Sequence, residues 1–327
     1  MSADMPTPWQ QRAYAQAIVA LDAGRLPHAL LVGGPAGLGK LALARRLAHR
    51  LMCSTPAGGD ACGQCRNCTL IAAGTHPDLI EETFEINEKT KELRKEILIT
   101  QVRRLGEKLV LTPQIAAGQV ALVYPAEAMN RNAFNALLKT LEEPPAGRTL
   151  ILIADRPQRL PATIRSRCQW LRLEIPPVAE ALAWLQAQGH APVVAQQALE
   201  AAQGNPGLAE QYLAEDGIRL RQAVAADLAA LAQQRAGVAE LAAAWVEDRP
   251  ALRLRFSGEL VRDHLAQRAG APRPDALAAA GLSVLLPVEA LGDWFDACAR
   301  TLRGLDSPLR QDLQLAELLI GWQRLAD

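Results

Sequence analysis

Gly34-Pro35-Ala36-Gly37-Leu38-Gly39-Lys40-Leu41 is the stretch of sequence that decides the fold. It follows an apolar run at 29–32, which predicts a buried strand, and precedes 42–48, which predicts a helix. A G-x-x-x-x-G-K pattern between a strand and a helix is typical of a phosphate-binding loop. The glycines Gly34, Gly37 and Gly39 would let backbone N–H groups close around phosphate oxygens, and Lys40 would reach the outer phosphates. An incidental glycine-rich turn is the alternative interpretation.

The sequence departs from an ATPase at the positions that would hold magnesium. Leu41 stands where a Ser or Thr hydroxyl would bind Mg²⁺. The next predicted strand, 120–123, runs into Tyr124 and Pro125, where an ATPase has an Asp and a Glu. Glu127 comes three places late, where we expect a turn. The sequence therefore predicts a phosphate loop that lacks the usual magnesium ligands.

Four cysteines follow the loop helix with the spacing of a metal site. Cys62, Cys65 and Cys68 form two overlapping C-x-x-C steps, and glycines at 58–59 give Cys53 room to fold back as the fourth ligand. Four thiolates suit a closed, structural Zn²⁺ site, without the open position that a catalytic metal needs. A redox-active dithiol and simple packing are the alternatives. We predict structural zinc.

Composition and length limit the other possibilities. A chain of 327 residues predicts two or three domains. The net charge is zero, so the overall balance gives no argument for non-specific binding to DNA or anionic lipid. No apolar run approaches the roughly 18 residues of a membrane span, and the start of the chain lacks a signal-peptide pattern. We therefore expect a cytoplasmic protein without a membrane partner, with its cysteines as thiols or metal ligands.

Alternating predicted strands and helices indicate an α/β domain with a mainly parallel sheet over residues 1–175. The prolines at 176–177 mark a boundary. A small helical domain is expected over 176–214, broken by Gly204-Asn205-Pro206-Gly207, and an all-helical domain over 215–327. The predicted fold is a parallel-sheet domain with an inserted zinc module, followed by two helical domains.

The four cysteines and three further stretches together resemble the sliding-clamp loader subunits of the AAA+ class. The three stretches are Asn135-Ala136-Leu137-Leu138-Lys139-Thr140-Leu141-Glu142-Glu143-Pro144-Pro145, Ser166-Arg167-Cys168, and Ala73-Gly74-Thr75-His76-Pro77-Asp78 after the cysteines. They occur in the order found in bacterial members. The resemblance covers residues 8 to about 210, whereas the last third is similar only in its helical character. It implies a P-loop AAA+ domain, a lid domain and a C-terminal collar domain.

Within that family, Leu41, Tyr124 and Pro125 point to a subunit that does not hydrolyse ATP. Gly207 stands where the family has a nucleotide-sensing arginine, whereas Arg167 is retained. The resemblance implies that Arg167 acts as an arginine finger in trans, in a neighbour's active site. It also implies a hetero-pentamer with tau or gamma ATPase subunits and the delta subunit. This complex would open the sliding clamp and load it on primed DNA for the DNA-directed DNA polymerase III holoenzyme.

Three other functions stay open at this stage. An active ATPase motor subunit would have to hold Mg²⁺ through Glu127 and Asp155, the available acids, neither of which stands at the expected strand end. A nucleic-acid-binding zinc protein would need more cations near the cysteines than Arg66. A small-molecule P-loop kinase fits poorly with two appended helical domains. Whether ATP still binds is also open, since the glycines and Lys40 remain, and any such binding should be non-hydrolytic.

Overall fold

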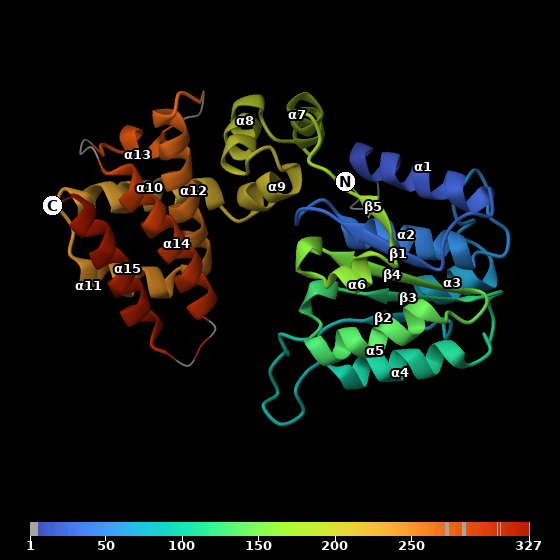
Figure 1. The fold of residues 1–327 in the computed structure, drawn as a ribbon. Helices are drawn as coiled ribbons and strands as arrows, with labels where there is room; N and C mark the ends of the chain where they lie inside the picture. Colours follow the sequence, from blue (N-terminus) through green and yellow to red (C-terminus); the bar gives the residue numbers. More distant parts are fainter. Residues whose placement is uncertain (1–5, 272–274, 283–285, 306, 308, 327) are drawn as a thin grey trace. The chain divides into compact units, whose positions relative to one another are not determined.

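The computed structural model describes residues 6–271, 275–282, 286–305, 307 and 309–326. The chain forms two compact units, Met1–Ala209 and Glu210–Asp327 (Figure 1). The first unit contains the sheet, and the second consists of helices. The predicted α/β class with a helical C-terminal part is therefore confirmed. The finer boundaries at 175/176 and 214/215 stay predictions.

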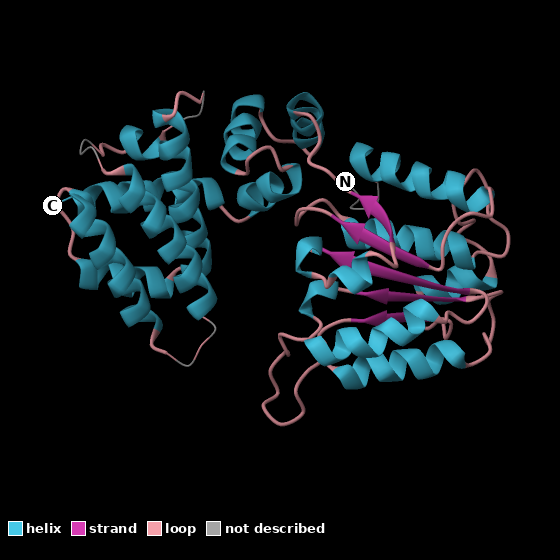
Figure 2. Cartoon of the chain, viewed as in Figure 1, coloured by secondary structure: helices cyan, strands magenta, loops and turns pink. Residues whose placement is uncertain are grey.

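Five strands form one sheet in the order β2-β3-β4-β1-β5, and every pairing in it is parallel. β4 is the central strand, and β1, which precedes the phosphate loop, lies between β4 and β5; the register of β1 and β4 pairs Leu31 with Leu152. A parallel sheet needs both faces covered, and Figure 2 shows helices on each side of it. The strands are β1 (Ala29–Gly33), β2 (Leu79–Glu82), β3 (Gln119–Val123), β4 (Arg148–Ala154) and β5 (Gln169–Arg172).

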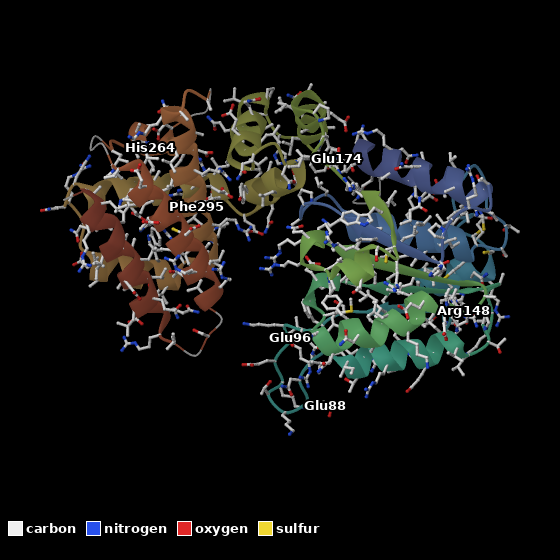
Figure 3. All side chains as sticks on the ribbon, viewed as in Figure 1. Glu88, Glu96, Arg148, Glu174, His264 and Phe295 are labelled. Atoms are coloured by element: carbon white, nitrogen blue, oxygen red, sulfur yellow. The ribbon has the colours of Figure 1, made fainter. Side chains whose placement is uncertain are left out.

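Side chains that alternate along the strands build two cores in the first unit. Leu30 and Val32 pack with α1 and α2 on one face, whereas Ala29 and Leu31 pack with α4 and α5 on the other (Figure 1). Arg148, labelled in Figure 3, ties the start of β4 to the end of α4 through the carbonyl of Leu109. The helices are α1 (Pro8–Asp22), α2 (Lys40–Met52), α3 (Arg66–Ala72), α4 (Ile99–Val110), η1 (Ala126–Ala128), α5 (Arg131–Glu142), η2 (Pro157–Arg159), α6 (Ala162–Arg165), α7 (Val178–Ala187), α8 (Pro192–Ala201) and α9 (Pro206–Ala214).

Buried tryptophans organise the second unit, and each finds a partner for its indole N–H. Trp245 donates to Asp227, and Trp322 donates to the carbonyl of Leu228 on α10. Trp294 donates to the carbonyl of Leu318, and its ring is tilted against that of Trp322, with ring centroids 4.6 Å apart. The helices are α10 (Gly217–Ala232), α11 (Val238–Glu247), α12 (Pro250–Arg268), α13 (Ala276–Ala279), α14 (Val288–Gly304) and α15 (Gln311–Ala326). Among the residues described, none of the helices is long and apolar enough to cross a membrane.

Candidate functional site

The phosphate loop joins β1 to α2, and its backbone is held from outside by helix α1. The indole of Trp9 donates to the carbonyl of Leu38 at 3.1 Å, and the amide of Gln10 donates to the carbonyl of Gly39 at 2.8 Å. With its carbonyls bound to α1, the loop can offer its N–H groups to an anion. Gly39 needs its glycine, because its φ is +75° and a Cβ would lie 2.0 Å from the Gln10 amide.

The tip of the loop lies against the start of helix α9. The Asn205 side chain donates to the carbonyl of Ala36 at 2.8 Å and accepts the N–H of Leu208 at 3.1 Å. A Cβ on Gly207 would lie 1.8 Å from the carbonyl oxygen of Gly37. The predicted Gly204-Asn205-Pro206-Gly207 break therefore supports the phosphate loop, which spacing along the sequence could not reveal.

Lys40, the first residue of α2, already has a carboxylate partner. Its Nζ lies 2.6 Å from Oδ1 of Asp155 and donates to the carbonyl of Pro35 at 2.5 Å. The Lys40 side chain is only 3% exposed. The sequence offered Asp155 only as an acid available to an active motor subunit, and its ion pair with Lys40 was not predicted.

Tyr124 directly follows β3, where an ATPase has its metal-holding acid, and it joins a hydrogen-bonded group with Glu81 of β2 and Arg45 of α2. The Tyr124 hydroxyl donates to Glu81 at 2.9 Å and accepts from Arg45 at 3.1 Å, while Arg45 also binds Glu81 through two hydrogen bonds. Burial first, then the Glu81 carboxylate, raises the pKa of Tyr124, which keeps its hydroxyl protonated. This arrangement presents a neutral phenol in place of a metal-binding carboxylate.

Glu127 lies in the short helix η1, close to the end of β4. Its Oε1 accepts the backbone N–H groups of Asp155 and Arg156 at 3.0 and 2.9 Å. The expectation of a turn at Glu127 agrees with this 3₁₀ helix. Glu127 therefore shapes the loop that carries Asp155.

Arg167 follows helix α6, and its guanidinium is held by two groups near the surface. One Nη donates to the carbonyl of Thr163 at 2.9 Å, and the other lies 2.7 Å from Glu142 at the end of α5. The side chains of Arg167 and Glu142 are 37% and 49% exposed. Exposed ion pairs contribute only about 0–1 kcal/mol, so Arg167 can exchange Glu142 for another anion at little cost.

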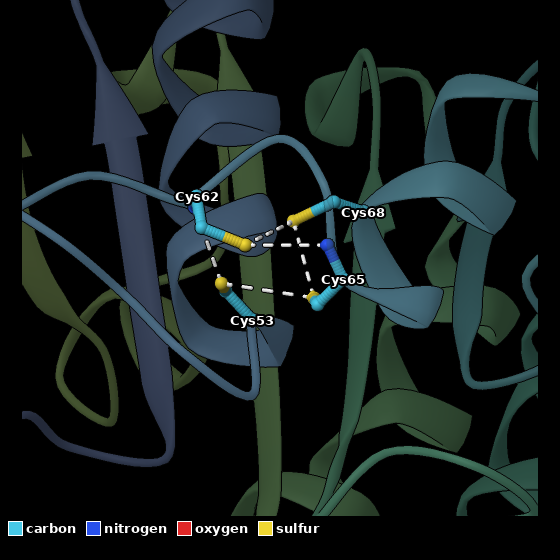
Figure 4. A group of neighbouring side chains, drawn as sticks. All are labelled: Cys53, Cys62, Cys65 and Cys68. Carbon is cyan, nitrogen blue, oxygen red and sulfur yellow. Dashed lines mark hydrogen bonds between the residues drawn. The ribbon is translucent and has the colours of Figure 1, made fainter.

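The sulfur atoms of Cys53, Cys62, Cys65 and Cys68 lie within 4.8 Å of one another (Figure 4). Neighbouring Sγ–Sγ distances are 3.9 Å for 53–65, 4.0 Å for 62–68 and 3.5 Å for 65–68. Zn–S bonds of about 2.3 Å define a tetrahedron with sulfur–sulfur edges of about 3.8 Å, which these distances match. The cluster could hold a metal ion, and its size fits zinc.

Nearby groups prepare some of the thiols for ionisation. The backbone N–H of Cys62 donates to Cys53 Sγ at 3.2 Å, and that of Cys65 donates to Cys62 Sγ at 3.3 Å. A hydrogen bond from Ser54 leads the effects that lower the pKa of Cys65 to about 5. Burial, followed by the neighbouring thiols, raises the pKa of Cys68 to about 12. Four thiolates at this spacing need a cation between them, because like charges raise each other's pKa.

A buried polar chain connects the cysteine cluster to the sheet. Asn67, between the last two cysteines, donates to the carbonyl of Met52 at 2.7 Å and bonds the ring of His76 at 3.2 Å. The N–H of Asp78 donates to His76 Nδ1, so the ring proton lies on Nε2 and is given to Asn67. His76 and Asp78 were predicted only as part of a resembling stretch, whereas Asn67 was not predicted, and the roles of all three depend on packing.

Together, the order of the sheet, the phosphate loop and the appended helices define a P-loop protein of the AAA+ class. The family model described as DNA polymerase III, delta subunit matches residues 9–177. The delta′ subunit of Pseudomonas aeruginosa is 42% identical over 73% of this chain and 70% of its own length. That of Escherichia coli K12 is 35% identical over 81% of this chain and 77% of its own length. The chain belongs to the family of DNA polymerase III delta′ subunits.

More distant similarities are to proteins named as other DNA polymerase III subunits. The tau subunit of Salmonella typhimurium is 39% identical over 47% of this chain and 23% of its own length. A gamma subunit-related protein of Thermotoga maritima, known from its crystal structure, is 14% identical and covers 95% of this chain and 100% of its own, with a TM-score of 0.46.

Proposed function

We propose that this chain is an ATPase-deficient subunit of the bacterial clamp loader, which helps to open the sliding clamp and load it on primed DNA. The observation that carries the proposal is the Tyr124 hydroxyl, bound to Glu81 and Arg45 where a metal-holding acid is needed. Leu41, on the other side of the loop lysine, supplies no hydroxyl for magnesium. Without these groups the pocket lacks the metal grip that hydrolysis requires.

The main competing function, an active motor subunit, would need Glu127 and Asp155 as metal ligands. The Oε1 atom of Glu127 accepts two backbone N–H groups, and Asp155 is paired with Lys40. Binding Mg²⁺ through Asp155 would break the ion pair of a lysine that is almost fully buried. These contacts favour an ATPase-deficient subunit over an active ATPase subunit.

Arg167 is the residue we propose as the arginine finger in trans. Its exposed guanidinium, held by the weak pair with Glu142, supplies forked donors suited to phosphate oxygens. Such a finger contributes about 10³–10⁵ in rate to the neighbour that receives it. A subunit without its own ATPase activity can therefore complete the active site beside it.

The proposed partners are tau or gamma ATPase subunits and the delta subunit, in a hetero-pentamer of the DNA polymerase III holoenzyme. The relatives named delta′ and tau support such an assembly. We assign residues 215–327 to a collar that holds the ring, and residues 176–214 to a lid. The cysteine cluster would hold a structural zinc ion, which in the reducing cytoplasm can be bound by free thiolates. Gly34, Gly37, Gly39 and Lys40 would bind nucleotide weakly, if at all, and without hydrolysis.

Reconstitution of the complex with Arg167→Ala tests the proposal. This variant should assemble normally but lower the DNA-stimulated ATP turnover of the complex at least tenfold, because such a finger contributes about 10³–10⁵ in rate to the site that receives it. Arg12→Ala is the matched control, because Arg12 is also exposed and paired with one carboxylate, that of Glu180. The isolated wild-type chain should release no phosphate from ATP. Unchanged turnover with Arg167→Ala, or turnover by the isolated chain, would contradict the proposal.

A further inference from the structure

The chain supplies its own anion to the lysine of the phosphate loop. Oδ1 of Asp155 lies 2.6 Å from Nζ of Lys40, in an ion pair whose side chains are 47% and 3% exposed. A buried ammonium group is costly unless it is paired. In a working phosphate loop the phosphates of the nucleotide pair with this lysine. Here a carboxylate of the same chain does so.

The backbone around Asp155 fixes this carboxylate in place. Asp155 directly follows β4, whose last residue, Ala154, accepts the N–H of Gly34 at the start of the phosphate loop. On the other side, Oε1 of Glu127 accepts the N–H groups of Asp155 and Arg156. The strand end and Glu127 therefore hold the Asp155 backbone beside the loop, so the ion pair is part of a built site.

A carboxylate and a phosphate compete for the same donor, since both offer anionic oxygens to an ammonium group. A nucleotide could use Lys40 only after Asp155 had left it, and the displaced carboxylate would then lie close to the incoming phosphate. Like charges at such short range repel each other and lower the affinity further. Both effects act against a nucleoside di- or triphosphate.

We propose that Asp155 is the residue that sets the phosphate affinity of this loop, as an intramolecular competitor of nucleoside di- and triphosphates for Lys40. This inference rests on the proposed function, because it explains how the loop of a silent subunit keeps its shape yet binds nucleotide poorly. Removal of the Asp155 charge is sufficient to restore nucleotide binding. It does not supply the magnesium ligands that the loop lacks, so hydrolysis stays absent.

Calorimetric titration of the full chain with ATP tests this inference, in magnesium-free buffer without chelator so that the cysteine cluster stays intact. Asp155→Asn should bind ATP at least about tenfold more tightly than wild type, and Asp155→Ser should do the same. The double variant Lys40→Ala/Asp155→Asn should lose that gain. Asp22→Asn is the matched control, because Asp22 is also exposed and pairs with one cation, Arg50, away from the loop.

Two folded Asp155 variants that bind ATP no more tightly than wild type would overturn the inference, and urea unfolding of each variant establishes that it is folded. The inference would also be overturned if the double variant Lys40→Ala/Asp155→Asn kept the gain in ATP affinity. ATP turnover, measured on the same samples with magnesium, separates this inference from the proposed function. If the wild-type chain hydrolyses ATP, the proposed function is wrong. If it does not, and the Asp155 variants bind ATP no more tightly than wild type, only the role of Asp155 is wrong.

Discussion

Gly207, near the start of α9, lies so close to Gly37 that a Cβ on Gly207 would be 1.8 Å from the Gly37 carbonyl oxygen. Asn205, two residues before Gly207, donates a side-chain hydrogen bond to the carbonyl of Ala36 in the same loop. The start of α9 therefore touches the phosphate loop through backbone atoms. A side chain at position 207 would need this contact to open.

We predict that Gly207→Ala separates the phosphate loop from α9. Because the added Cβ would meet backbone, which cannot rotate away, we expect a loss of about 2–3 kcal/mol in the free energy of unfolding, the upper part of the range for overpacking. Urea unfolding of the chain measures this loss. Gly292→Ala is the control, since a Cβ on Gly292 in α14 meets no atom within 4 Å. Equal stability of the two variants would contradict the close packing.

How much of this site the sequence could predict depends on the distance between partners along the chain. The phosphate loop and the cysteine spacing are local patterns, and both were found from residue types alone. The pair of Lys40 with Asp155 and the bond from Asn205 to Ala36 join residues that are 115 and 169 positions apart. Their contacts depend on which strand ends and helix turns meet. Hydrophobic periodicity predicts the elements but does not give that pairing.

The Arg167 motif shows the same limit. Its resemblance to Ser-Arg-Cys motifs could be found in the sequence, and so could the resembling stretch at 135–145 that contains Glu142. That the two motifs meet through the Arg167–Glu142 ion pair follows only from the placement of α6 beside α5. Likewise, Tyr124 was predicted as the loss of an acid, whereas its bonds to Glu81 and Arg45 required the structure.

We predict that Asp78→Asn destabilises the first unit. The Asp78 carboxylate is fully buried and accepts the N–H groups of Gln114, Ile115 and Ala116. Burial alone would raise its pKa, but these three donors outweigh burial and hold the pKa below its ordinary value. An Asn amide would turn an N–H group toward at least one of them, so we expect a loss of about 2–4 kcal/mol. Urea unfolding measures it, with Asp22→Asn as the exposed control. A loss no larger than that of the control would contradict this role.

We predict one zinc ion per chain, lost on Cys65→Ala. With one thiolate removed, a tetrahedral structural site cannot close, and metal binding and local folding are coupled. Elemental analysis of protein purified without chelator measures the metal, and limited proteolysis measures the folding of the cysteine module. Cys168→Ala is the control, because Cys168 is buried outside the cluster, where burial raises its pKa to about 11. Wild-type protein without zinc would refute the assignment.

The helical unit contains a buried acid whose charge is costly. Glu259, in α12, is 7% exposed, and its Oε1 accepts a hydrogen bond from Tyr212 at 3.2 Å. Its other oxygen has no hydrogen-bond partner among the described residues. Burial raises the pKa of Glu259 to about 7, although Tyr212 and the arginines Arg221, Arg262 and Arg255 act against the rise.

This raised pKa predicts a pH dependence of stability. Between about pH 4.5 and 7 the folded chain keeps a proton on Glu259 that the unfolded chain has released, so the free energy of unfolding falls as the pH rises through that window. Glu259→Gln cannot ionise, and we expect it to lose this contribution and to be about 1–3 kcal/mol more stable than wild type at pH 8. Urea unfolding at pH 5 and pH 8 measures both effects, with Glu247→Gln, an exposed position in the same unit, as the control. If Glu259→Gln kept the pH dependence of wild type, burial would not be raising this pKa.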